Sequence, residues 1–149
     1  MGMDASGERS CVFCRIVRGE AESFAVLEDE LTMAFLDTRP LFPGHCLLIP
    51  RGHHRTLPDL PAALLAPLFA NAQLLCRAMD RALAAEGAFV AMNNRVSQSV
   101  PHLHVHVVPR RHKDGLKGFF WPRGRYADGA AAGEVQAALR AAVDGLRAG

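Results

Sequence analysis

The 149-residue chain lacks several features that would mark a function class at once. It has no excess of one charge, because 17 Lys and Arg stand against 15 Asp and Glu; this balance gives no general electrostatic reason to bind nucleic acid or an anionic membrane. No uninterrupted apolar run approaches the roughly 20 residues of a membrane-spanning helix. Residues 1–10 lack the hydrophobic region of a secretory signal, so we expect a cytoplasmic protein.

The order of apolar segments predicts an α+β fold. Short apolar runs between turn residues predict strands at 23–28, 31–37, 45–49, 88–93 and 101–109. Apolar residues recur at three- and four-residue steps over 57–85 and again over 129–147, which predicts one long helix and a C-terminal helix. Pro67 lies inside the first pattern and predicts a late start or a kink there. This order favours a mainly antiparallel five-stranded sheet.

The length favours one domain, 1–149, because it is close to the modal domain size. Within it we distinguish an N-terminal arm over 1–22, a catalytic core over 23–110, and a basic and aromatic segment with the C-terminal helix over 111–149. A glycine-rich phosphate loop of the dinucleotide or nucleoside-triphosphatase type is absent.

The arm contains a Cys-x-x-Cys pair, Cys11 and Cys14. In a reducing compartment such a pair indicates half of a metal site or a redox pair, and a structural disulfide is the least favoured interpretation. A redox pair normally opens a helix directly after a strand, and nothing before Cys11 has strand character. Zinc is therefore favoured, although two further ligands are needed.

The most informative stretch is His102-Leu103-His104-Val105-His106. In a strand the three imidazoles share one face, at intervals of about 6.5–7 Å, while the aliphatic residues form the other. Two chemistries use such a face: zinc chelation, or attack by a neutral imidazole on an electrophile. The eleven positions before His102 contain no acidic residue to serve as the base of a catalytic zinc site, which favours a histidine nucleophile.

These residues resemble a known family. His102-x-His104-x-His106, followed by two valines, is similar to the signature of the histidine-triad (HIT) superfamily. The segment 43–51, Pro-Gly-His-Cys-Leu-Leu-Ile-Pro-Arg, is similar to its upstream segment, and Phe35-Leu36-Asp37 to its strand end. Cys11-Val12-Phe13-Cys14 resembles the opening of its zinc-containing branch. The pieces follow the family's order over about residues 10–110.

The resemblance implies an enzyme that binds a nucleoside 5′-phosphate derivative, expected to be an adenosine phosphate, and splits it at the α-phosphorus. His104 would be the nucleophile and form a nucleotidyl-histidine intermediate that water hydrolyses. His106 and His45 would hold the phosphate oxygens. The remaining polar positions that match the family's substrate contacts are Asp37 for the ribose hydroxyls, and Asn93, Gln98 and Ser99 near the phosphate or leaving group.

The resemblance also implies the complete metal site. Cys11, Cys14, His53 and His102 would hold a zinc ion as a Cys₂His₂ tetrahedron. Four protein ligands leave no open position, so this zinc would be structural. A homodimer is expected on the same grounds, with Trp121 or the C-terminal helix at its interface.

Two departures from the family leave the substrate open. The loop before the triad is short, and Ser97 stands where a glycine is usual. The basic segment 110–125 is either a solvated rim or a site for a polyphosphate tail, at Lys113, Lys117, Arg123 or Arg125. The open activities are a dinucleoside polyphosphate hydrolase, a nucleoside phosphoramidase and a nucleotidyltransferase. From another class, a zinc-stabilised nucleotide sensor or interaction module with little turnover is the alternative.

Overall fold

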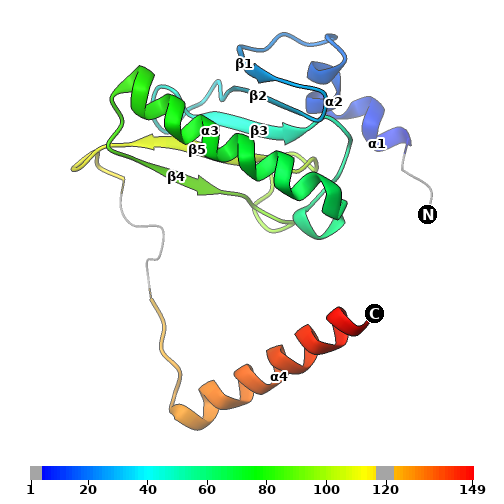
Figure 1. The fold of residues 1–149 in the computed structure, drawn as a ribbon, viewed down its shortest axis with the longest axis vertical. Helices are drawn as coiled ribbons and strands as arrows, with labels where there is room; N and C mark the ends of the chain where they lie inside the picture. Colours follow the sequence, from blue (N-terminus) through cyan, green and yellow to red (C-terminus); the bar gives the residue numbers. More distant parts are fainter. Residues whose placement is uncertain (1–4, 117–122) are drawn as a thin grey trace. The chain divides into compact units, whose positions relative to one another are not determined.

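A five-stranded sheet organises most of the chain. The structure, a computed structural model, describes residues 5–116 and 123–149. The strands are β1 (Ala25–Glu28), β2 (Thr32–Leu36), β3 (Cys46–Pro50), β4 (Gly87–Ala91) and β5 (Val105–Arg110), in the spatial order β1-β2-β3-β5-β4 with every pair antiparallel (Figure 1). The predicted α+β fold is confirmed.

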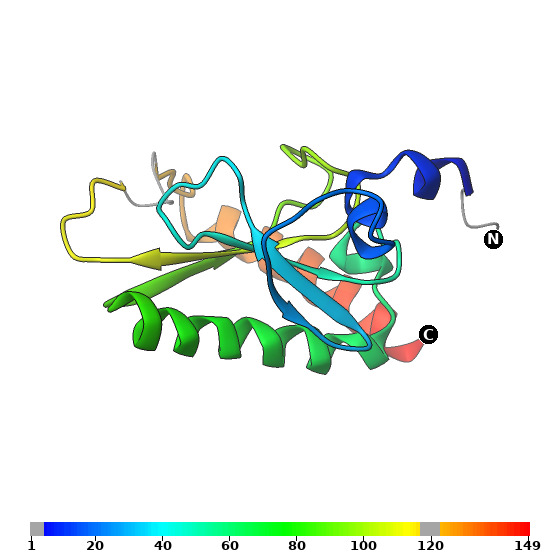
Figure 2. The same ribbon diagram turned by 90° about the horizontal axis from the view of Figure 1, so that it is seen from above.

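One long helix covers one face of this sheet (Figure 2). Two short 3-10 turns, Leu57–Asp59 (η1) and Ala62–Leu64 (η2), precede α3 (Leu65–Leu83). The predicted helix therefore starts late, and Pro67 lies in its first turn, where a missing N–H leaves no bond unmade. The apolar stripe packs against aliphatic residues of the sheet, and its buried members are Leu68, Ala72, Leu75 and Met79.

The opposite face carries α2, one of two short N-terminal helices that the sequence patterns did not predict. These are α1 (Ala5–Ser10) and α2 (Val12–Val17), and α2 lies across the sheet from α3 (Figure 2). Its buried residues join a second apolar cluster that includes Phe35, Leu47 and Ile49. Six-residue helices have too few turns to show a helical period, which is why the pattern missed them.

Residues Ala62–Leu83 are long and apolar enough to cross a membrane by length and composition, with a mean hydropathy of 1.3 in one window. This property was not predicted from the sequence, because polar residues interrupt the apolar run in this segment. Because Leu68 and Leu75 on this helix are almost fully buried against the sheet, we assign it as the core helix of the fold.

Residues from Gly115 onward form a second compact unit. It contains α4 (Gly129–Ala148), in agreement with the predicted C-terminal helix, capped by the Asp128 side chain, which accepts a hydrogen bond from the Ala131 amide at 2.8 Å. No residue of α4 is buried. Lys117 and Trp121, for which roles were predicted, lie outside the described residues.

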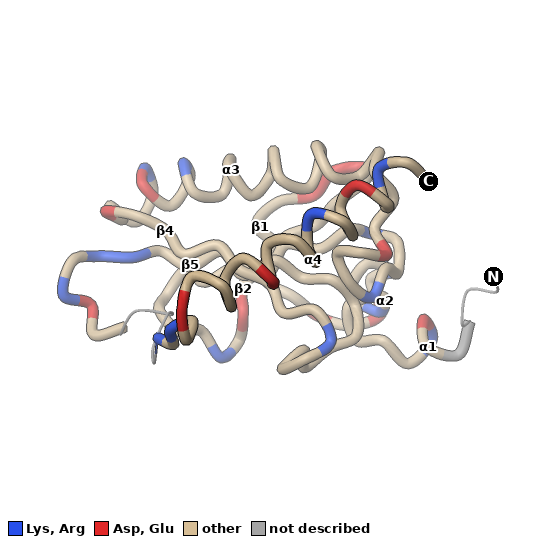
Figure 3. Tube along the Cα trace, turned by 90° about the horizontal axis from the view of Figure 1, so that it is seen from below, with Lys and Arg blue, Asp and Glu red and all other residues tan. Residues whose placement is uncertain are grey.

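Acidic and basic residues are interspersed along the described chain (Figure 3). Two basic residues at and after the end of β5 have acidic partners: Arg110 pairs with Asp114, and His112 with Glu86. This distribution agrees with the near-neutral net charge of +2.

Candidate active site and metal centre

The histidine-bearing stretch leads into β5, an inner strand of the sheet. His106 is in β5, opposite Leu47 of β3 and Ala91 of β4, whereas His102 and His104 precede the strand, which begins at Val105. The strand is thus shorter than predicted. The alternation still holds: Leu103, Val105 and Val107 are fully buried on the α3 side, and the rings of His102 and His104 both contact Phe13 on the α2 side.

His104 is held in one tautomer by the backbone. Its Nδ1 lies 2.8 Å from the carbonyl oxygen of His102, which can only accept, so Nδ1 carries the proton. The Nε2 of a neutral His104 therefore has a free lone pair. The Phe13 ring packs against the imidazole edge-on, with 5.2 Å between ring centroids, and fixes its orientation. This is the arrangement that an imidazole nucleophile requires.

His106 has the opposite tautomer, set through His45. The Leu41 amide donates to Nδ1 of His45 at 3.1 Å, so a neutral His45 carries its proton on Nε2. That Nε2 lies 2.9 Å from Nδ1 of His106 and donates to it. The proton of His106 is then on Nε2. His104 and His106, whose ring centroids are 5.1 Å apart, therefore differ: His104 presents a lone pair on Nε2, and His106 presents an N–H donor on Nε2.

Burial keeps His45 and His106 uncharged. The pKa of His106 is lowered to about 4, first by burial and then by the neighbouring histidines His104 and His45. The pKa of His45 is lowered by burial as well, against an opposing effect of the Asp37 carboxylate, whose Oδ2 is 3.7 Å from His45 Nε2. Both imidazoles are therefore neutral at pH 7.

Asp37 lies at the end of β2, beside this pair. Its amide donates to the His45 carbonyl at 2.9 Å, and its Oδ1 accepts from the Arg39 amide at 2.8 Å, while the side chain stays partly exposed. The ligand atoms of Asp37, His45 and His106 lie within 4.8 Å of one another, close enough for a metal. A metal on His45 Nε2 would move the ring proton to Nδ1, where the Leu41 amide already donates, so the hydrogen bonds disfavour this second site.

The loop between β4 and β5 is braced by its own amide side chains. Asn93 donates to the Ser97 carbonyl at 3.1 Å. Gln98 accepts from the Arg95 amide at 2.9 Å and donates to the Arg55 carbonyl at 2.6 Å. These bonds engage both ends of the Gln98 amide, so in this structure Asn93 and Gln98 position the loop, whereas Ser99 is exposed, with no hydrogen-bond partner among the described residues.

Ser97 adopts φ +59° and Arg95 φ +71°. Such conformations are uncommon for residues other than glycine and cost about 1 kcal/mol or more. Ser97, which stands where the family usually has glycine, thus has a left-handed backbone conformation that glycine adopts without strain.

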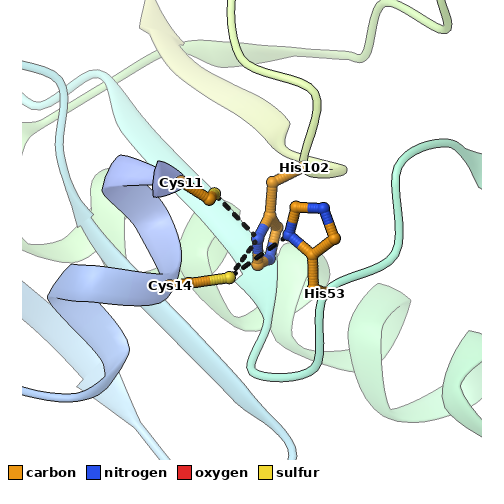
Figure 4. Close-up of side chains that lie close together, drawn as sticks. All are labelled: Cys11, Cys14, His53 and His102. Atoms are coloured by element: carbon orange, nitrogen blue, oxygen red, sulfur yellow. Dashed lines mark hydrogen bonds between the residues drawn. The ribbon is translucent and has the colours of Figure 1, made fainter. Parts of the chain in front are cut away.

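Four side chains from three segments converge beneath α2. Cys11 and Cys14 come from the start of α2, His53 from the segment after β3, and His102 from the stretch before β5 (Figure 4). His102 Nδ1 is 3.5 Å from each sulfur, and His53 Nδ1 is 3.2 Å from Cys14 Sγ. All four ligand atoms lie within 4.8 Å of one another, so the structure brings together the whole predicted metal set.

The donor chemistry of this cluster fits a zinc ion. His102 Nε2 donates to the Pro50 carbonyl at 2.9 Å, which leaves Nδ1 unprotonated and directed at the thiols. Burial, then the Cys11 hydrogen bond, raise the pKa of the Cys14 thiol to about 12, and burial lowers the pKa of His102 to about 4. Cys11 and Cys14 are free cysteines, not joined in a disulfide. A buried divalent cation would offset the free-energy cost of burying their thiolates.

The comparisons with known proteins agree with this site. The HIT domain model matches residues 18–113, and the chain belongs to the HIT domain family. The chain is 34% identical to adenylylsulfatase HINT3 of Arabidopsis thaliana over 111 residues, 73% of this chain and 56% of that protein. It is 35% identical to adenosine 5′-monophosphoramidase HNT1 of Saccharomyces cerevisiae over 78% of this chain and 73% of the relative.

Solved structures extend the likeness. A zinc-bound histidine triad family protein from Mycobacterium smegmatis is 37% identical and has a TM-score of 0.70, covering 88% of this chain and 99% of its own. A protein from Streptococcus mutans has a TM-score of 0.82 at 33% identity, covering 95% of this chain and 87% of its own. The predicted resemblance, including the zinc-containing branch, is confirmed.

Two features of the site were missed by the sequence analysis. The Leu41 amide acts through its backbone, so no side-chain pattern could reveal it. Arg55 and Arg95 lie on two segments that meet only in the folded chain, joined by the Gln98 bond. Their basic character was visible, but nothing in the sequence indicated that they line one cavity.

Proposed function

We propose that the chain hydrolyses nucleoside 5′-phosphate derivatives at the α-phosphorus, through a nucleotidyl intermediate on His104. The main support is the pair of opposite tautomers, a lone pair on His104 Nε2 beside an N–H donor on His106 Nε2. A metal-binding or purely structural role needs no such pairing. The names of two relatives, an adenylylsulfatase and an adenosine 5′-monophosphoramidase, support an adenosine phosphate derivative as substrate.

In the first step His104 Nε2 forms a bond to the α-phosphorus, and the bond from phosphorus to the leaving group breaks, with its electron pair going to the leaving group. The His106 N–H donates to a non-bridging phosphate oxygen and stabilises the charge that accumulates there. In the second step water adds to phosphorus and loses a proton to solvent, and His104 departs with its lone pair restored. The neutral state of His106 and His45 fits hydrogen-bond donation without transfer of a full charge.

Asp37 is the proposed ribose contact. A carboxylate accepts from both ribose hydroxyls, and Asp37 Oδ2 lies next to His45, at the end of β2. Ser99, with its exposed hydroxyl, is the proposed phosphate contact of the loop, and Asn93 and Gln98 act by fixing the loop's shape.

Cys11, Cys14, His53 and His102 would hold zinc, and the ion would then cross-link their three segments without taking part in the reaction. These residues tie α2 to the catalytic stretch. Since the Phe13 ring on α2 packs against His104, this link also positions the nucleophile. We further propose that the chain forms a homodimer.

Mass spectrometry of the quenched reaction tests the mechanism. Incubation with an adenosine 5′-phosphate derivative should attach AMP to the wild-type protein, and tandem fragmentation should place it on His104. The His104→Ala variant should show no adduct, and the His112→Ala variant, which removes an exposed histidine, should behave as wild type. An adduct that persists in His104→Ala, or its absence from wild type, would exclude the proposed covalent step.

A further inference from the structure

A cavity of about 450 Å³ lies beside the loop that precedes the triad, between this loop and residues 55–59. Its charged lining consists of Arg55, Arg95 and Asp59. The Asp59 carboxylate accepts from the Thr56 hydroxyl at 2.6 Å. Neither guanidinium has a hydrogen-bond or ion-pair partner in the part of the chain that the structure describes. Two unpaired guanidinium groups against one carboxylate leave the cavity with a net positive charge, which suits an anion.

The backbone conformation of Arg95 is strained. Its backbone has φ +71°, and the Gln98 side chain accepts from its amide at 2.9 Å while donating to the Arg55 carbonyl. This bridge holds the backbones of the two arginines together. A strained residue that is fixed by a dedicated side chain is a common feature of ligand-binding loops.

In chain order, the cavity and the proposed ribose contacts lie on opposite sides of His104. Asp37 and His45, the proposed ribose side, are next to His106, which follows His104 in the chain. Pro101 and Gln98, which line the cavity, precede His104, and the three residues from Pro101 to His104 span at most about 11 Å. Lys113 instead follows the far end of β5, about 20 Å or more along the chain from His104, and lines a separate pocket with Glu86.

We propose that the cavity between Arg55 and Arg95 binds the distal phosphates of a polyphosphate leaving group, so that the chain favours nucleoside 5′-polyphosphates over substrates with an amine leaving group. This rests on the proposed hydrolysis at His104. A polyphosphate leaves as an anion, and the guanidinium groups stabilise its charge by charge-assisted hydrogen bonds.

The test compares diadenosine tetraphosphate with adenosine 5′-phosphoramidate. Arg95→Gly removes the side chain while the backbone keeps its positive φ without strain, and Lys113→Gly is the matched control, because Lys113 is also basic and has φ +60°. For Arg95→Gly and Arg55→Ala, we expect kcat/KM for the tetraphosphate to fall 10- to 100-fold, as for loss of a charge-assisted hydrogen bond. Turnover of the phosphoramidate should stay within two-fold of wild type, and Lys113→Gly should leave both substrates unchanged. Equal losses on both substrates, or no loss on the tetraphosphate, would overturn the proposal.

A binding measurement separates this inference from the proposed hydrolysis. Titration calorimetry with inorganic tripolyphosphate should show binding to wild type and to Lys113→Gly, and none to Arg95→Gly or Arg55→Ala. Binding should weaken with rising salt. Failure of wild type to bind tripolyphosphate would overturn the cavity assignment whatever the turnover, whereas absence of the AMP adduct with intact, Arg95-dependent binding would overturn only the mechanism at His104.

Discussion

At the scale of single residues, two backbone groups determine the chemistry of the site. The His102 carbonyl fixes the proton of His104 on Nδ1, and the Leu41 amide, acting through His45, fixes that of His106 on Nε2. Neutral imidazoles have two tautomers of similar energy, so a single hydrogen bond decides between them. The roles of the two histidines therefore depend on two backbone groups, one of which acts directly and the other through His45.

This assignment predicts the effect of Leu41→Pro, which removes the amide donor. Without it, His45 can carry its proton on either nitrogen, and His106 should become a mixture of tautomers. We expect kcat to fall about tenfold, equivalent to roughly 1.4 kcal/mol. The ¹⁵N chemical shifts of histidine-labelled protein report the tautomers directly. Leu41→Ala, which shortens a half-exposed side chain and keeps the amide, is the control; an unaltered His106 spectrum in Leu41→Pro would contradict the role of this amide.

The lowered pKa of His106 predicts a pH-dependent stability. In the unfolded chain its pKa returns to the ordinary value of 6.5, so unfolding takes up a proton between pH 6.5 and about 4. The contribution of neutral His106 to the free energy of unfolding is complete above pH 6.5. It decreases as the pH falls from 6.5 to about 4, by at most about 1.4 kcal/mol per pH unit. Urea unfolding at successive pH values should show a shallower decrease for His106→Gln than for wild type. The exposed-site variant His112→Gln should keep the wild-type slope.

At the scale of elements, the sequence patterns identified the strands and the two long helices, whose apolar residues are periodic, and missed the two six-residue helices. The aliphatic residues at alternate positions around His104 correctly predicted one buried and one histidine-bearing face. They did not predict that the ladder begins only at Val105, which pairs with Leu48 of β3, because such pairing depends on contacts between segments that are distant in the chain. Likewise Asn93 and Gln98 were identified as polar loop residues, but their partners Ser97 and Arg55 are set by the fold of the loop.

The element that would depend most on the proposed zinc ion is α2. A helix of six residues has little intrinsic stability, and its two cysteines face His53 and His102. Cys14→Ser, or removal of metal by a chelator, should lower the free energy of unfolding by about 3 kcal/mol and Tm by roughly 10 °C. Hydrogen exchange of residues 11–17 should accelerate most. Cys76→Ser, at a half-buried cysteine outside the cluster, should retain one zinc per chain by elemental analysis; a wild-type protein without zinc would contradict the assignment.

At the scale of the whole molecule, the chain forms two compact units joined near residue 115. The pattern of apolar residues predicted every strand and both long helices. It could not resolve how the final segment relates to the catalytic unit, because periodicity reports which face of α4 is apolar and contains no information about its partner. The sequence likewise did not locate the proposed anion site, since Arg55 and Arg95 are 40 residues apart in the chain.

The proposed homodimer gives α4 a partner. Its apolar stripe consists of Val135, Leu139, Val143 and Leu146, and Leu139 and Leu146 are 62% and 81% exposed. An apolar stripe of this kind is costly to leave in water, so we expect a second copy of the chain to cover it. Light scattering coupled to gel filtration should give the mass of two chains for wild type and of one chain for Leu139→Lys, because the lysine places a charge in the apolar contact. Arg140→Ala, on the polar face, should stay dimeric. A wild-type mass of a single chain, or a Leu139→Lys variant that remains dimeric, would show that α4 does not form the interface.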